Sequence, residues 1–119
     1  MVIWASDGQD GSGNGVFGRM LTADGTAVTG EFQVNSYTTN NQLSSAVALD
    51  SDGDFVVVWY SAFSGGSDFD GYSIQGQGYN SAGMPQGAEF QVNTYTNNAQ
   101  RYPDISLDSD GDFVVVWAS

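Results

Sequence analysis

The sequence predicts an all-β protein made of β-propeller blades, and three observations support this fold class. The chain has 16 glycines and only 2 prolines among 119 residues, together with abundant Val, Phe, Tyr and Trp. Such a composition is typical of short strands separated by turns. The chain also repeats itself, and each repeat holds four strand candidates. We therefore expect two four-stranded antiparallel repeats of about 58 residues, as part of a larger or oligomeric propeller.

The repeat is visible when the chain is aligned with itself at an offset of 58 residues. Residues 31–61 then overlie residues 89–119, and 21 of these 31 positions are identical. One tryptophan recurs as Trp4, Trp59 and Trp117, at spacings of 55 and then 58 residues. The difference in spacing falls in a glycine-rich loop, which is where a stacked repeat tolerates insertions.

Four strands are expected in each repeat, and turn residues bound each of them. The run FVVVW at 55–59 is entirely apolar, which predicts a strand covered on both faces. Residues 89–93 alternate between polar and apolar types, so Phe90 and Val92 should point inward and Asn93 outward. No helix of two turns is expected. In the complete repeat the expected strands are Ser45 to Leu49, Phe55 to Ser61, Gly71 to Tyr79 and Ala88 to Asn93.

The repeat divides the chain into three segments. We expect residues 1–43 to be a partial repeat with the second to fourth strands, 44–101 a complete repeat, and 102–119 the first two strands of a further repeat. Two blades cannot surround an axis, because propellers need about four or more. The missing blades are expected from the rest of a longer polypeptide or from further copies of this chain, which would make an isolated chain a homo-oligomer. The alternatives are a β-sandwich or another array of stacked sheets.

The chain is strongly acidic, with 14 Asp and Glu against 2 basic residues and a net charge of −12 at pH 7. Such a field repels phosphate backbones and anionic lipid, so we expect neither nucleic acid nor membrane surfaces as partners. No run approaches the roughly 20 apolar residues of a membrane helix, and membrane insertion is not expected. The acidity fits a salty extracellular setting. We expect a secreted or cell-surface protein whose export signal lies outside these residues.

The words EFQVNTYT and FVVVW resemble the tandem repeats of large secreted or surface proteins of marine bacteria and cyanobacteria. The resemblance covers nearly the whole chain and is carried by Glu31–Asn35 and Asp50–Trp59, by their copies at 89–93 and 108–117, and by QDGSGNG at 9–15. Those proteins often carry hemolysin-type calcium-binding or cadherin-like modules elsewhere in the same polypeptide. The resemblance implies a propeller-like repeat region with an adhesive or scaffolding role, and it supplies no catalytic residues.

The sharpest chemical feature is the twice-repeated LDSDGDF, because clustered carboxylates are what Ca²⁺ requires. The pattern departs from an EF-hand loop in the place of its glycine and in lacking the final bidentate Glu. A turn is the alternative: Asp52-Gly53 and Asp110-Gly111 are hairpin signals in which both residues can adopt positive φ. The two roles are compatible, and Ca²⁺ is the one cofactor that the sequence suggests. The candidate metal ligands are Asp50, Asp52, Asp54, Asp108, Asp110 and Asp112.

A second candidate site lies in the glycine-rich loop that follows the second strand of the complete repeat. This loop differs in length from its counterpart in the first repeat, and variable loops often determine binding specificity. The recurring tryptophans are expected to pack between blades instead. The alternative is a solvated connection. The candidate ligand-binding residues are Phe63, Phe69, Asp68 and Asp70.

Catalysis by a Ser/His/Asp or Cys/His set is excluded within this chain, because it contains neither His nor Cys. A carboxylate pair is also not expected, since Glu31 and Glu89 occupy equivalent positions in successive repeats and should lie too far apart. We therefore expect a non-enzymatic structural or adhesive repeat module of an extracellular bacterial protein. The alternative is a lectin-like propeller that binds a glycan or a protein, with or without Ca²⁺.

Overall fold

The computed structural model describes residues 2–7, 14–34, 42–62, 72–93 and 101–118, and these ranges form strands and turns without a helix. The predicted all-β class is therefore confirmed for the described part of the chain. Every strand pair is antiparallel, and the sheets do not close on themselves. The strands are β1 (Val2–Asp7), β2 (Asn14–Arg19), β3 (Phe32–Gln33), β4 (Gln42–Leu49), β5 (Phe55–Ala62), β6 (Tyr72–Tyr79), β7 (Pro85–Gln91), β8 (Arg101–Leu107) and β9 (Phe113–Ala118).

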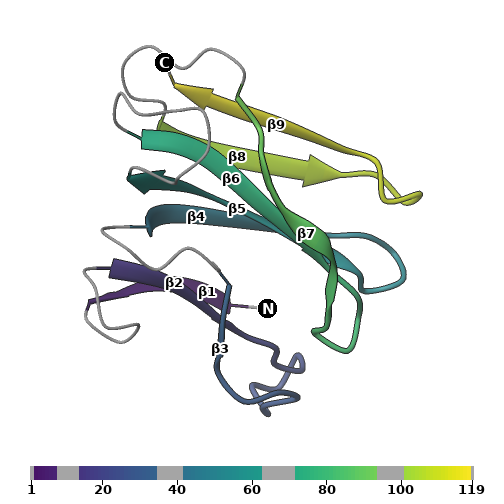
Figure 1. Cartoon of the computed structure of the whole chain (residues 1–119). Coiled ribbons are helices and arrows are strands. Elements are labelled where there is room, and N and C mark those ends of the chain that lie inside the picture. The colour runs from purple at the N-terminus through teal and green to yellow at the C-terminus, as the bar shows by residue number, and fades with distance from the viewer. Residues whose placement is uncertain (1, 8–13, 35–41, 63–71, 94–100, 119) are drawn as a thin grey trace.

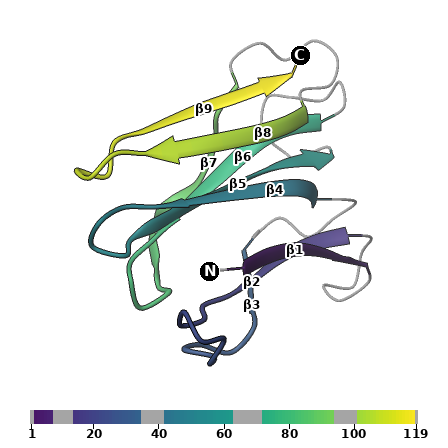
Figure 2. The ribbon, with the colours of Figure 1, turned by 180° about the vertical axis from the view of Figure 1, so that it is seen from behind.

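Each sheet contains strands that follow one another along the chain. β1, β2 and β3 form the first sheet, β4 to β7 form the central sheet, and β8 and β9 form the last sheet, each in sequence order. Figure 1 shows the three sheets as layers, with the central sheet between the other two, and Figure 2 shows the same layering from behind. Neighbouring layers therefore come from successive parts of the repeated sequence.

The predicted strands of the complete repeat are all present, with shifted ends. β5 and β6 agree with prediction to within one residue at each end, and eight consecutive pairs join them, from Phe55 with Tyr79 to Ala62 with Tyr72. β4 begins three residues before the predicted Ser45, and β7 begins three residues before the predicted Ala88. Each of these two strands lies at an edge of the central sheet, where fewer cross-strand partners fix its length.

Strand β5 is covered on both faces, as its apolar run predicts. Phe55, Val57 and Trp59 are fully buried in a cluster that includes Val16 of the first sheet. Val56 and Val58 point the other way and pack in a second cluster with residues of the last sheet. Alternate side chains of one strand therefore hold the layers on either side of it.

Strand β9 has the same FVVVW sequence, yet one of its faces is open. Val115 packs against the cluster around Val58, which is the side toward the central sheet. Val114 and Val116 point away and are 66% and 59% exposed, and Trp117 is 37% exposed. The two-sided coverage predicted for the run at 55–59 is therefore confirmed in β5. The outer face of β9 is exposed, because no described strand stacks on the outer side of the last sheet.

The turns that follow β4 and β8 are hairpins, as predicted, but of a different kind. In the first, the N–H of Asp50 donates to the carbonyl of Asp54 at 2.9 Å and the N–H of Gly53 donates to the carbonyl of Asp50 at 3.2 Å. Gly53 has φ of 85°, whereas Asp52 does not have positive φ. The expectation of two residues with positive φ is therefore wrong: the loop has three residues, and only its glycine takes the left-handed conformation.

Asn93 also departs from its prediction. It was expected to point outward from the fourth strand, but it lies just beyond the end of β7 and is only 3% exposed. Its Oδ1 accepts a hydrogen bond from the N–H of Ile74 at 2.8 Å. The strict alternation ends with the strand, and the amide turns inward because it satisfies a backbone donor of the neighbouring strand.

Candidate functional site

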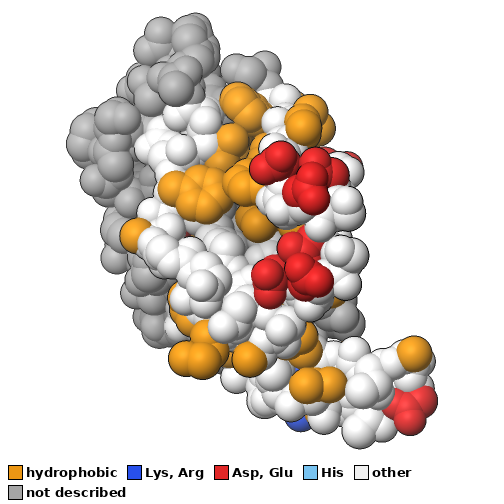
Figure 3. All heavy atoms as spheres, turned by 90° about the vertical axis from the view of Figure 1, so that its right-hand side faces the viewer, with side chains coloured by type: hydrophobic (Ala, Val, Ile, Leu, Met, Phe, Trp, Pro, Cys, Tyr) orange, Lys and Arg blue, Asp and Glu red, His pale blue; other side chains and the backbone are white. Residues whose placement is uncertain are grey.

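The two acidic turns lie side by side at one end of the stacked sheets. The hydroxyl of Ser51 donates to the carbonyl of Ser109 at 3.3 Å, across a sequence separation of one repeat. A Cβ atom on Gly111 would come within 3.4 Å of Oδ2 of Asp50. Figure 3 shows carboxylates in two neighbouring groups at this end of the molecule. The stacking of the sheets thus brings the two copies of LDSDGDF together.

The first aspartate of each turn holds the turn closed. Oδ1 of Asp50 accepts hydrogen bonds from the N–H groups of Asp52 and Asp54, at 2.9 and 3.1 Å. Oδ1 of Asp108 accepts the same pair of bonds from Asp110 and Asp112, at 2.9 and 3.0 Å. A side-chain acceptor at this position mimics a backbone turn. Asp50 and Asp108 therefore serve the local backbone.

A turn with the same hydrogen bonds joins β6 and β7, and it shows that the first position of such a turn needs a hydrogen-bond acceptor and not a charge. Between β6 and β7, Oδ1 of Asn80 accepts from the N–H groups of Ala82 and Met84, both at 3.0 Å. Asn80 is neutral, yet it makes the same two bonds as Asp50. The backbone role of the first aspartate is thus explained without a bound cation.

The last aspartate of the first turn connects two turns of the central sheet. Oδ1 of Asp54 accepts a hydrogen bond from the N–H of Ser81 at 2.9 Å. Asp50, Asp54 and Asp110 also line a hollow of about 240 Å³ between the two acidic turns. Among the described residues, no group of three acidic side chains is placed to hold a metal ion. The calcium site stays a prediction, which calorimetric titration of chelated protein with Ca²⁺ would test.

The predicted ligand-binding residues Phe63, Phe69, Asp68 and Asp70 lie outside the described residues. The structure therefore does not say whether these four side chains come together. Of the predicted sites, only the aspartate turns can be compared with their expected geometry.

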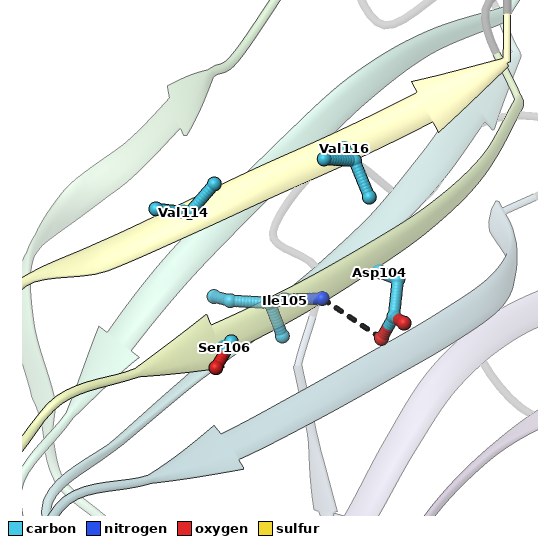
Figure 4. Close-up of a pocket in the computed structure, with 5 residues that line it drawn as sticks. All are labelled: Asp104, Ile105, Ser106, Val114 and Val116. Atoms are coloured by element: carbon cyan, nitrogen blue, oxygen red, sulfur yellow. Dashed lines mark hydrogen bonds between the residues drawn. The ribbon is translucent and has the colours of Figure 1, made fainter.

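The open face of the last sheet was missed by sequence reasoning. Val114 and Val116 of β9 lie beside Asp104 and Ser106 of β8, and Figure 4 shows these side chains around a shallow hollow of about 120 Å³. Oδ1 of Asp104 accepts a hydrogen bond from the N–H of Ile105 at 2.9 Å. One signal was present: Asp104 and Ser106 stand where the preceding repeat has alanines. Polar residues at these positions are a mark of a less buried face.

One buried hydroxyl connects the central sheet to the first sheet. The phenol of Tyr79 donates a hydrogen bond to the carbonyl of Val34 at 3.1 Å, and its ring stacks on Phe55 with a centroid distance of 5.0 Å. Burial raises the pKa of Tyr79 to about 12, and the negative charge of Glu89 adds to the shift. Tyr79 therefore stays protonated and keeps donating this bond at neutral pH.

Comparison with family models, curated proteins and solved structures finds no match for this chain. The described residues include no helix with the length and apolar character that crossing a membrane requires. The function must therefore be argued from the arrangement of the residues themselves.

Proposed function

We propose that this chain is a non-enzymatic structural or adhesive repeat module of an extracellular bacterial protein, built to stack with further repeats in a propeller-like array. The observation that carries the proposal is the double burial of β5. Its two faces pack against sheets that come from the preceding and the following repeat. A repeat of this kind cannot bury its apolar residues alone, so stacking supplies its core.

The words that recur in the sequence support a structural role. In the complete repeat, FVVVW forms the buried centre of the stack, and DSDGD forms a closed hairpin turn. Asn93, from the word EFQVN, is buried and accepts a backbone hydrogen bond. The repeated segments therefore contain the residues that pack in the core and form the turns.

The extracellular and adhesive part of the proposal rests on the charge and on the resemblance. A net charge of −12 suits a solution that is rich in salt or divalent cations. The resemblance to repeats of secreted and surface proteins of marine bacteria points to the same setting. The alternative is a lectin-like propeller, in which the loop that contains Phe63 and Phe69 would bind the ligand.

A glycan array separates the two functions. We expect no reproducible glycan binding by the intact chain, with or without Ca²⁺. Saturable binding that is lost on substituting Phe63→Ala and Phe69→Ala would contradict the structural proposal and favour the lectin. The array should include a well-characterised lectin as a positive control, so that an absence of signal is meaningful.

A further inference from the structure

We infer that both edges of the complete central sheet are closed to strand addition, so that a neighbouring repeat or chain joins this sheet through its faces. The edges are formed by β4 and β7, each of which pairs with a single strand among those described (Figure 1). An unprotected edge offers a row of unpaired N–H and C=O groups to another strand. The inference deepens the proposed function, on which it rests, by naming which surfaces of a repeat accept a neighbour.

In the central sheet, the pairing is interrupted at both edges and is regular between the inner strands. β5 and β6 pair through eight consecutive residues without a shift. The pairing of β4 with β5 shifts register, so that residues 44–45 stand opposite Trp59 alone. The pairing of β7 with β6 shifts at Gln77, which has residues 87–89 opposite it. In both cases the edge strand contains the extra residues, and such a bulge bends and twists its strand.

The same contrast holds in the two other sheets. β1 and β2, the counterparts of β5 and β6 in the repeat, pair through six consecutive residues without a shift. β8, the counterpart of β4, shifts register against β9 between Arg101 and Asp104. β3, the counterpart of β7, is only two residues long. Bulges and very short strands are means by which natural sheets protect their edges. The protection therefore belongs to the first and fourth strands of the repeat.

The bulge of β8 contains a residue in an uncommon backbone conformation. Its extra residues are Tyr102 and Pro103, which stand opposite Trp117. Tyr102 has φ of 57°, in the left-handed region, which costs free energy for a residue with a side chain. Pro103 has no backbone N–H to offer to another strand. A costly conformation that is retained at a sheet edge supports a role for the bulge itself.

The edge formed by β7 is exposed, and its own backbone lacks a donor there. Residues 85–88 are exposed. The N–H of Asn80 donates to the carbonyl of Met84, so in the alternation of an antiparallel pair the nitrogen of Pro85 points to the outer edge. Because proline has no N–H, a donor is missing where a further strand would need one.

A buried side chain holds the bulge of β7 in place. Gly87 has φ of 76°, a conformation that residues with a side chain rarely adopt, so the strand leaves its straight path there. The amide of Gln77 donates to the carbonyl of Gly87 at 3.1 Å and to that of Gly78 at 3.0 Å. Gln77 is buried, which shields these bonds from competition by water. The interruption of β7 is therefore a fixed feature of the sheet and not a frayed end.

Restoring a regular edge tests the inference. Deleting residues 87–88 brings Glu89 opposite Gln77, so that β7 would pair with β6 without a shift. Pro85→Thr adds the missing donor and a residue that favours strands. Sedimentation velocity and thioflavin T fluorescence measure the association. We expect the chain with both changes to associate at a concentration at least about tenfold lower than the unsubstituted chain. The same deletion with Pro85 kept should associate less strongly.

Gly25→Val is the matched control for lost stability. Gly25 has φ of 88° and lies in a turn outside the strands, and no atom of the described residues lies within 4 Å of an added Cβ atom. Valine strains this turn but leaves both edges unchanged, so association should equal that of the unsubstituted chain. Far-ultraviolet circular dichroism shows whether each variant keeps its sheets. If the deletion abolishes the fold, Pro85→Thr alone decides: it should still promote association, and no change would overturn the inference.

The outcomes separate this inference from the proposed function. A folded deletion variant that associates no more than the unsubstituted chain would overturn the closed edges, as would equal association of the Gly25→Val chain. The proposed function survives either result as long as the three sheets of one chain remain stacked. It fails if that internal stacking is absent, whatever the edges do.

Discussion

The side-chain amide of Asn93 continues the hydrogen bonding of β6 beyond the point where its backbone pairing with β7 ends. It is buried, and it accepts the backbone N–H of Ile74 at 2.8 Å, next to the point where β7 ends. The N–H of Val92 donates to the carbonyl of Ile74 at 2.8 Å, so Val92 and Asn93 together hold the beginning of β6. This role explains why the segment EFQVN at 89–93 ends in asparagine.

Substituting Asn93→Ala should lower the free energy of unfolding by about 1–3 kcal/mol, because it leaves a buried backbone donor without a partner. Urea unfolding followed by circular dichroism measures the change. Gln86→Ala is a suitable control, since Gln86 is exposed and its side chain makes one long bond of 3.4 Å to the carbonyl of Met84. Equal stabilities for the two variants would contradict the proposed role of Asn93.

Tyr79 should make the stability depend on pH in the alkaline range. Its pKa is raised by burial from 10.0 to about 12. Between these values the unfolded chain releases the phenol proton while the folded chain keeps it, so the free energy of unfolding falls as pH rises above about 10. Below pH 10 the stabilising effect is fully present.

The variant Tyr79→Phe tests this pH dependence. It should be less stable at neutral pH by about 0.5–1.5 kcal/mol, through loss of the bond to the carbonyl of Val34. It should also lose less stability than the unsubstituted chain between pH 10 and 12. Urea titrations at several pH values measure both effects, and parallel pH profiles for the two proteins would show that Tyr79 is not the titrating group.

At the scale of the strands, Gly76 of β6 allows the fourth strand to lie close. A Cβ atom at this position would come within 2.7 Å of the ring of Phe90, and within 3.4 Å of a methyl group of Val58. The ring of Phe90 also contacts that of Phe113 in the last sheet, at a centroid distance of 6.2 Å. The glycine therefore makes room for an aromatic ring between the central and last sheets.

Substituting Gly76→Ala should lower the free energy of unfolding by about 1–3 kcal/mol, because the added methyl group overpacks this region. Gly78→Ala is the control on the same face of the same strand, where the nearest atom would be 3.7 Å away. The double variant Gly76→Ala, Phe90→Leu should recover part of the loss relative to Phe90→Leu alone. An effect of Gly78→Ala as large as that of Gly76→Ala would argue against close packing at Phe90.

The sequence predicts the strands and turns well where the types and spacing of neighbouring residues determine the local structure. The apolar run of β5 and the glycine-containing turns follow from residue type and spacing, and the structure agrees with both. The conformation of Asp52 could not be predicted in this way, because Asp-Gly occurs in two-residue and three-residue hairpin loops alike. The hydrogen bond between Asn80 and its turn was also missed, since the sequence there lacks the acidic residues that drew attention elsewhere.

The exposure of β9 could not be predicted from its own sequence. FVVVW is identical in β5 and β9, yet Val58 is buried and Val116 is 59% exposed. Burial depends on whether another sheet lies across the face, and this is a property of the whole stack. The one local indication was the pair Asp104 and Ser106 in place of alanines, which makes the outer side of β8 more polar.

At the scale of the whole molecule, the three sheets form one stack with apolar clusters between the layers. The Cα radius of gyration is 13.8 Å, and the chain extends 41 × 32 × 22 Å along its principal axes. The cluster that contains Val57 connects the first and central sheets, and the cluster that contains Val58 connects the central and last sheets. Because both clusters share β5, loosening either outer layer should weaken the other.

Methyl nuclear Overhauser effects test this stacking most directly. In protein with labelled Val and Ile methyl groups, we expect cross-peaks between Val56 or Val58 and Ile105, and between Val57 and Val16, because each set shares a buried cluster. Chemical shifts of a Val58→Ala variant would confirm the assignments. Cross-peaks of Ile105 confined to its own two-stranded sheet, with none to β5, would contradict the account.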